Sequence, residues 1–322
     1  MDRWVRSLRR EKTPPATGLP PPVAHEHERR PGGGLRETAT LFLVGKECPF
    51  SCVFCDLWQE TLDGATPVGS LPQQLEPALR QISHRSAIKL YNASNFFDPA
   101  AVPPEDDATM LKLLDGFERV IVECHPRFLG ARCFSFAERL SGTLEVAIGL
   151  ETVHPDVLPR LNKKMTVADF DTAAAALGRR QIGLRAFVLL GCPFIPAAEQ
   201  LGWTLRSVEH AARQGAGTIS IIPVRGGNGA LEALAADDDW RPVRLDLVEA
   251  VFERALELDL TDVVVQVDVW DLERVGQDRL CSECPECFDA RRARLIDMNR
   301  LGAIMPAVRC ARCAARRPGG GS

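Results

Sequence analysis

Short apolar runs recur between residues 38 and 270 and alternate with longer amphipathic stretches. The runs are continuous rather than alternating, which is typical of strands in a parallel sheet that are buried on both faces. We expect six such strands, at 39–44, 87–91, 119–123, 144–150, 184–190 and 218–223. Helical patterns lie between them, at 71–83, 107–117, 131–141, 167–179 and 198–214.

Strands and helices that alternate in this way indicate βαβ units with right-handed crossovers. Six units predict an α/β fold, a partial (β/α)6 barrel, with its site at the carboxyl ends of the strands. Polar and sulfur-bearing residues do follow these ends. The first strand leads into Cys48, the second into Asn92 and Ser94, and the fourth into Glu151.

The remaining chain divides by composition. Residues 1–37 are rich in Pro, Gly and Arg, so we expect a flexible basic segment. Residues 38–270 form the barrel, and residues 271–322 form a small carboxyl-terminal Cys-rich extension and tail. No apolar run is long enough to span a membrane and no secretory signal is apparent, so we expect a cytoplasmic protein.

Charge and size bound the function only loosely. The chain has 322 residues, of which 45% are hydrophobic, enough for a large core. The net charge is −4, which argues against a polyanion binder as a whole. Both ends are rich in arginine, however, and such runs either contact phosphates or are simply solvated.

Eleven cysteines in such a chain favour metal binding over disulfides. Cys48, Cys52 and Cys55 have the spacing CxxxCxxC, which places three thiolates in one loop. Iron–sulfur clusters are normally held by four thiolates, so three would leave one iron of a cubane cluster open. The alternatives are a structural zinc site, which prefers four ligands, or three ordinary buried thiols.

These cysteines, with Phe54 directly before the third, resemble the motif of the radical SAM superfamily. The resemblance implies a radical SAM type of barrel and a 4Fe-4S cluster whose open iron binds S-adenosylmethionine. It also implies one-electron cleavage to a 5′-deoxyadenosyl radical, with the electron supplied by a flavodoxin- or ferredoxin-like donor. Phe54 would then lie beside the adenine.

Three further segments resemble the branch that contains the elongator catalytic subunit and the methylthiotransferases. They are residues 122–126, 149–152 and 161–166. Within the branch, the chain is similar to the group that contains the radical enzyme of archaeosine biosynthesis. His125 stands where the branch has arginine, which leaves the role of that position open.

The strand ends offer partners for each part of S-adenosylmethionine. Asn92 and Ser94 are expected to accept hydrogen bonds from the ammonium group, and Glu151 to hold the ribose hydroxyls. Arg185 is a charge within an apolar strand. It either pairs with the methionine carboxylate or forms an ion pair inside the barrel with Glu123 or Glu145.

A second group of cysteines lies near the carboxyl end, spaced as CxxCxxC and, further on, CxxC. Paired knuckles of this kind predict a zinc site, and the rival is a second iron–sulfur cluster, or no metal at all. The group consists of Cys281, Cys284, Cys287, Cys310 and Cys313.

The leading hypothesis is a radical SAM enzyme that modifies an RNA or a small molecule. One alternative is a non-catalytic iron–sulfur or zinc protein that binds nucleic acid. The other is a methyl or methylthio transferase built on the same core.

Overall fold

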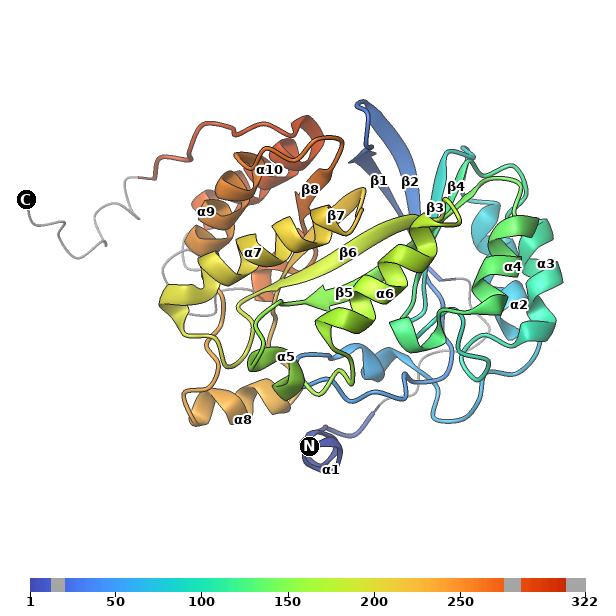
Figure 1. The fold of residues 1–322 in the computed structure, drawn as a ribbon, viewed down its shortest axis with the longest axis horizontal. Helices are drawn as coiled ribbons and strands as arrows, with labels where there is room; N and C mark the ends of the chain where they lie inside the picture. Colours follow the sequence, from blue (N-terminus) through green and yellow to red (C-terminus); the bar gives the residue numbers. More distant parts are fainter. Residues whose placement is uncertain (13–20, 275–284, 311–322) are drawn as a thin grey trace, which may run out of the picture.

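The computed structural model of the chain describes residues 1–12, 21–274 and 285–310, and these form one α/β structure around a curved sheet (Figure 1). The sheet has eight strands, in the order β1 to β8 from edge to edge. Strand β1 is antiparallel to β2, and each later strand is parallel to the one before it. The strands are β1 (Val23–Arg29), β2 (Leu35–Phe42), β3 (Ala87–Tyr91), β4 (Arg119–Glu123), β5 (Thr143–Glu151), β6 (Gly183–Leu190), β7 (Thr218–Pro223) and β8 (Val264–Val267).

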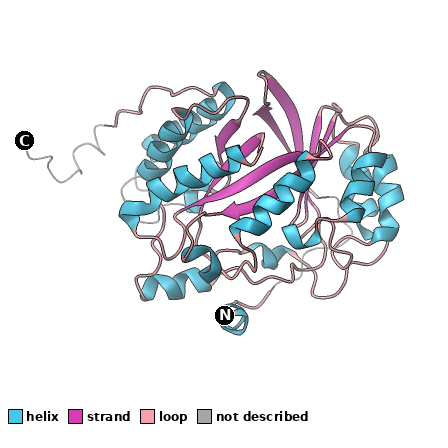
Figure 2. Ribbon diagram, in the orientation of Figure 1, coloured by secondary structure: helices cyan, strands magenta, loops and turns pink. Residues whose placement is uncertain are grey.

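The helices lie along the outside of the sheet and beyond the ends of its strands (Figure 2). They are α1 (Asp2–Ser7), α2 (Ser70–Leu79), α3 (Asp107–Leu113), α4 (Ala131–Arg139), α5 (Val157–Arg160), α6 (Val167–Gly178), α7 (Gln200–Arg213), α8 (Ala230–Ala236), α9 (Leu245–Leu256) and α10 (Pro285–Leu301). Among the described residues, we find no helix with the length and apolar character that a membrane crossing requires.

The predicted fold class is confirmed, and the six predicted strands correspond to β2–β7. The helices α2, α3, α4, α6 and α7 lie where the amphipathic patterns placed them. Local sequence explains how sharply some of them begin. At the start of α6, Thr166 accepts a hydrogen bond from the Asp169 amide while the Asp169 carboxylate accepts one from Thr166, a capping box.

The prediction of a flexible segment over residues 1–37 is wrong for α1 and β1. Strand β1 pairs along its whole length with β2, after a turn in which Gly32, Gly33 and Gly34 all have positive φ. The strand was missed because its inward positions carry Glu26 and Glu28 rather than apolar residues. Strand β8, only four residues long, was also missed.

Apolar side chains gather in two clusters. The larger one joins the outer face of the sheet to the surrounding helices. The smaller one lies at the carboxyl ends of the strands and brings Val5 of α1 together with Val53, Leu161 and Leu231. This second cluster packs the amino terminus against the segment that carries the first three cysteines.

Charged side chains inside the barrel form what we call the ion-pair layer: Glu26, Glu28, Lys89, Glu145 and Arg185. Lys89 Nζ lies 2.7 Å from both Glu26 Oε2 and Glu28 Oε1. Arg185 NH2 lies 2.9 Å from Glu28 Oε2, and its Nε lies 2.7 Å from Glu145 Oε1. The contacts join β1, β3, β5 and β6, which are not all neighbours in the sheet, so the layer crosses the barrel interior.

Candidate active site

The three cysteines lie in a loop directly after β2, here called the cysteine loop (residues 43–56). Its backbone is held from several sides. The Val53 amide donates to the Leu161 carbonyl at 3.1 Å, and Asn228 Nδ2 donates to the Val53 carbonyl at 2.8 Å. Asn162 Nδ2 donates to the Ser51 carbonyl at 2.7 Å. The loop is therefore tied to segments far away in the sequence.

The amino terminus also contacts this loop. Asp2 Oδ1 accepts hydrogen bonds from Ser51 Oγ at 3.1 Å and from Asn162 Nδ2 at 2.7 Å. Hydrogen bonds from Asn162 and Lys164 lower the pKa of Asp2 to about 2, so it is ionised at neutral pH. Helix α1, near the amino-terminal mark in Figure 1, thus packs against the cysteine loop.

Cys48, Cys52 and Cys55 are half-buried free thiols that lie close enough to influence one another's ionisation. Burial raises the pKa of all three, that of Cys52 to about 12. The charge of Cys48 contributes to the rise at Cys52, and Cys52 and Cys48 contribute to the rise at Cys55. Metal binding at these thiols must therefore release protons.

Among the described residues, no three His, Cys, Asp or Glu side chains converge closely enough to hold a single metal ion. An iron–sulfur cluster makes a different demand, because each cysteine binds a separate iron. Three neighbouring thiols in one fixed loop suit that demand.

Lys163 occupies the centre of the site. It pairs with Glu151, and its Nζ lies 6.0 Å from the centroid of the Phe54 ring. Burial opposes its charge, but the Glu151 carboxylate and the thiols of Cys52 and Cys48 raise its pKa. Lys163 is therefore a buried ammonium beside the cysteine loop.

The end of β5 is shaped to form this pair. The register of β5 shifts between Gly149 and Glu151, and Glu151 has a φ of 66°. A side chain at Gly149 would overlap the Glu151 carboxylate and the Lys163 ammonium. Any larger residue at this position would force these two charged groups to move.

His125 and Asn95 connect the neighbouring strand ends. Asn95 Nδ2 donates to Cys48 Sγ at 3.4 Å, and Asn95 Oδ1 accepts from the His125 amide at 2.7 Å. The His125 ring lies 4.1 Å from that of Phe50, and its Nε2 lies 3.0 Å from the Lys163 carbonyl oxygen. Burial and the nearby Lys163 lower the pKa of His125 to about 4, so the ring is neutral at physiological pH. His125 therefore has a structural role, because it connects the end of β4 to Asn95, Phe50 and the Lys163 backbone.

The side chains of Asn92 and Ser94, which follow β3, have no hydrogen-bond partner among the described residues. Asn92 is buried, with 1% of its surface exposed, and neither its amide nitrogen nor its amide oxygen makes a hydrogen bond. Ser94 Oγ is likewise buried without a partner. Native structures rarely leave such groups unpaired, so the two residues suit a polar ligand.

Glu123 adds a carboxyl group to the same region. Burial raises its pKa to about 7, although Lys163 and a hydrogen bond from the backbone N–H of Asn92 both lower it. It ends β4 and lies two residues before the neutral His125. From the sequence, Glu123 was expected as a possible ion-pair partner of Arg185 and not as a residue of the site.

Arg185 does not belong to this group. Its guanidinium is engaged by Glu145 and Glu28 in the ion-pair layer, and it is the third residue of the eight in β6. The interior ion pair with Glu145 is confirmed, while the second partner is Glu28 rather than Glu123. We leave Arg185 out of the proposed cofactor contacts.

The second cysteine group lies mostly outside the described residues, since Cys281, Cys284 and Cys313 all do. Cys287 is buried at the start of α10, and Cys310 is half-buried. Zinc or a second cluster there stays a prediction.

Three residues of the site were missed as site residues: Lys163, Asn95 and Asn228. Lys163 lies in the segment 161–166 that carries part of the family resemblance, and Asn95 directly follows Ser94 after the second predicted strand. Asn228 follows Gly226 and Gly227 after β7, and nothing local indicates that it reaches the cysteine loop.

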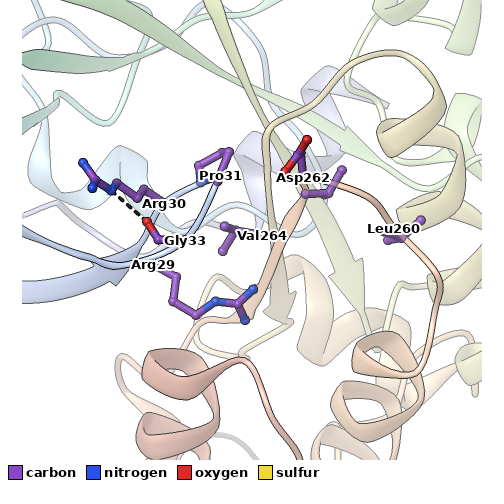
Figure 3. A pocket seen from close by; sticks show the side chains of 9 residues that line it. Arg29, Arg30, Pro31, Gly33, Leu260, Asp262 and Val264 are labelled. Carbon is purple, nitrogen blue, oxygen red and sulfur yellow. Dashed lines mark hydrogen bonds between the residues drawn. The ribbon is translucent and has the colours of Figure 1, made fainter.

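A cavity of about 280 Å³ lies elsewhere, between the β1–β2 turn and the segment that leads into β8 (Figure 3). Arg29, Arg30, Gly33, Asp262 and Val264 are among its lining residues. Arg29 pairs with Leu35, the first residue of β2, so the cavity opens at the amino ends of the parallel strands. It is separate from the cysteine loop, which follows the carboxyl end of β2.

No family model matches the chain. An uncharacterized protein of Methanocaldococcus jannaschii, MJ0550, is 20% identical over 224 residues, which cover 65% of this chain. The matched region spans 61% of the length of that protein.

Two solved structures share the fold at a TM-score of 0.50. One is the archaeal Elp3 of Methanocaldococcus infernus, 13% identical, with 71% of this chain and 56% of that chain covered. The other is methylornithine synthase (PylB), 14% identical, with 84% of this chain and 83% of that chain covered. Together with the sheet order, they show that the chain has the predicted partial α/β barrel, a fold that it shares with both proteins.

Proposed function

We propose that the protein is a radical SAM enzyme in which Cys48, Cys52 and Cys55 bind a 4Fe-4S cluster. The observation that carries the proposal is the position of these thiols. They neighbour one another in one fixed loop at the carboxyl end of a parallel barrel, beside a buried Lys163–Glu151 pair. A buried structural site would be expected to provide a fourth thiolate.

Several residues around the loop suit S-adenosylmethionine. The unpartnered oxygens of Asn92 and Ser94 would accept from its ammonium, Glu151 would hold its ribose, and Phe54 would lie beside its adenine. When bound, the cluster supplies one electron that cleaves S-adenosylmethionine and yields a 5′-deoxyadenosyl radical.

The chain itself positions the groups that would bind the cofactor and shields the cysteine loop from water. Lys163 holds the Glu151 carboxylate in position, and its positive charge favours the thiolate form of Cys52 and Cys48. Helix α1 and the smaller apolar cluster cover the loop and keep water from it. In this proposal a flavodoxin- or ferredoxin-like protein delivers the electron.

The substrate is an RNA or a small molecule, and the structure lends more support to the second. The arginine-rich ends of the chain and the carboxyl-terminal cysteines were the reasons to expect RNA. Two arginines of α10, at the carboxyl-terminal end, are instead nearly buried against α9: Arg291 pairs with Glu249, and Arg294 NH1 lies 3.5 Å from the same carboxylate. These charges are neutralised within the protein.

The test is to reconstitute the full chain anaerobically with iron and sulfide, add dithionite and S-adenosylmethionine, and measure 5′-deoxyadenosine. The Cys48/Cys52/Cys55→Ala triple variant should form less than about a hundredth of the wild-type amount, because no thiolate of the loop remains to hold the cluster. Cys133→Ala, a buried cysteine on the outer helix α4, serves as the matched control and should keep its activity.

Iron is counted in each sample. Iron that persists in the triple variant would assign a second cluster to the carboxyl-terminal cysteines, and zinc found there would assign the other metal. A fully loaded wild-type protein that yields no 5′-deoxyadenosine refutes the proposal and favours a non-catalytic binding protein. A methylated or methylthiolated product would instead indicate a transferase.

A further inference from the structure

Four aromatic side chains lie on the inner face of the barrel, and we call them the aromatic row: Phe42, Tyr91, Phe187 and Trp270. Residues two apart in a strand share a face. Tyr91 therefore lies on the face of Lys89, and Phe187 on the face of Arg185. The row is the next layer above the ion-pair layer, toward the carboxyl ends of the strands.

Ring contacts confirm this placement because they join strands that are not neighbours. The centroids of Tyr91 on β3 and Phe187 on β6 are 6.4 Å apart. Those of Phe42 at the end of β2 and Trp270 beyond β8 are 5.8 Å apart, and Phe42 lies 6.2 Å from Tyr91. The row therefore crosses the interior from one side of the barrel to the other.

The row is not sealed by the protein. Phe42 is 43% exposed and Trp270 is 39% exposed, which is unusual for large aromatic side chains inside a barrel. The row is also next to the proposed cofactor site, because Phe42 leads into the cysteine loop and Tyr91 immediately precedes Asn92. A molecule on the row would lie where the proposed radical forms.

Tyr91 gives the row one polar group. It is the only tyrosine of the chain, and its hydroxyl has no hydrogen-bond partner among the described residues. Burial raises the pKa of Tyr91, so the hydroxyl keeps its proton and can donate. Phenolic hydroxyls that are this enclosed usually have a partner.

Positive and negative side chains are equal in number within the ion-pair layer when Arg119 beside it is included. Lys89, Arg185 and Arg119 are matched by Glu26, Glu28 and Glu145. Trp270 Nε1 also donates to Glu26 at 2.9 Å, which fixes its ring above the layer. A charged ligand would therefore find no opposite charge left over in the ion-pair layer.

We propose that the aromatic row binds the substrate of the proposed enzyme, an uncharged planar ring that accepts a hydrogen bond from Tyr91. This inference rests on the proposed function. It narrows the substrate class from any RNA or small molecule to ring compounds that present an acceptor in the ring plane.

Three uncharged probes test it with the full-length protein, by saturation-transfer difference NMR. Quinoline is an uncharged planar ring with one acceptor, naphthalene has the same shape without the acceptor, and cyclohexanol is uncharged but not planar. Quinoline should bind most tightly and cyclohexanol should not bind detectably. Quinoline binding should persist when S-adenosylmethionine is added, because the row is distinct from the proposed cofactor contacts.

Two mild variants locate the binding. Tyr91→Phe should weaken quinoline binding by about three- to tenfold, the worth of one hydrogen bond, and leave naphthalene unchanged. Trp270→Leu should weaken both rings by about five- to tenfold. Trp203→Leu, on the outer helix α7 where its ring lies 4.2 Å from that of His154, is the matched control and should change neither.

Equal binding of cyclohexanol, displacement of quinoline by S-adenosylmethionine, or indifference to both variants would each overturn the inference. The 5′-deoxyadenosine assay on the same samples reports separately on the proposed function. Ring binding without 5′-deoxyadenosine would refute the enzyme, whereas 5′-deoxyadenosine without ring binding would refute only the aromatic row.

Discussion

The barrel interior holds two layers that treat polar groups in opposite ways. In the ion-pair layer each charged side chain faces an opposite charge at hydrogen-bonding distance. At the carboxyl end of β3, the side-chain polar atoms of Asn92 and Ser94 are buried without partners among the described residues. The hydroxyl of the half-buried Tyr91 makes no hydrogen bond to those residues either. Along β3 and the loop that follows it, these residues lie two to five positions after Lys89 of the ion-pair layer.

The difference indicates what each layer is for. A buried polar group without a hydrogen bond costs free energy of folding, whereas a paired one does not. The ion-pair layer is complete within the chain, so we assign it to closing and specifying the barrel. The polar groups at the carboxyl ends of the strands lack hydrogen-bond partners among the described residues, so we assign them to ligand binding.

The largest expected effect comes from breaking the ion-pair layer. Arg185→Met should lower the free energy of unfolding by about 3–5 kcal/mol, because Glu28 and Glu145 lose a buried partner. Urea denaturation measures the change. Arg254→Met is the control, since its pair with Glu257 is largely exposed and should be worth less than about 1 kcal/mol.

If Arg185→Met were as stable as the wild type, the ion-pair layer could not be what closes the barrel. Adding Glu28→Gln should recover part of the loss, because it removes one of the carboxylates left unpaired.

A smaller effect is expected from the pH dependence that Glu123 introduces. Its folded pKa of about 7 exceeds the ordinary value of 4.5, so the folded state binds the proton more tightly than the unfolded chain. Its contribution to stability is therefore present below pH 4.5 and is lost as the pH rises through 7. Because the Glu123 side chain is only half-buried, we expect the free energy of unfolding to fall by about 1–2 kcal/mol over this pH range.

Thermal unfolding between pH 4.5 and 8 measures this loss. Glu123→Gln should remove that part of the pH dependence, because glutamine does not titrate. Glu138→Gln, an exposed change on α4, should retain it. An unchanged pH profile in Glu123→Gln would mean that another group titrates in this range.

The smallest effect on stability is expected at Asn92, and it separates the two layers most sharply. Asn92→Leu removes two buried polar atoms that have no partner, so the free energy of unfolding should stay within about 1 kcal/mol of wild type or rise. S-Adenosylmethionine binding, measured by equilibrium dialysis, should nevertheless weaken at least about tenfold. A marked loss of stability would show that Asn92 is structural and that the layers do not differ in the way described.

The sequence by itself determined the parallel core and the position of its site. Continuous apolar runs predicted β2–β7, because strands that are buried on both faces are apolar at nearly every position. The CxxxCxxC spacing brings three thiols together by chain connectivity alone. The polar residues at strand ends followed from the direction of parallel strands, whose carboxyl ends meet at one edge.

Only the tertiary structure decided the remaining parts. Strand β1 reads as a charged tail because its partners, Lys89 and Arg185, are far away in the sequence and convert its glutamates into interior residues. The same long-range pairing decided between the two roles considered for Arg185. Lys163, Asn228 and the aromatic row likewise depend on contacts between distant segments, since a side chain's neighbours inside a barrel are set by sheet closure and not by local pattern.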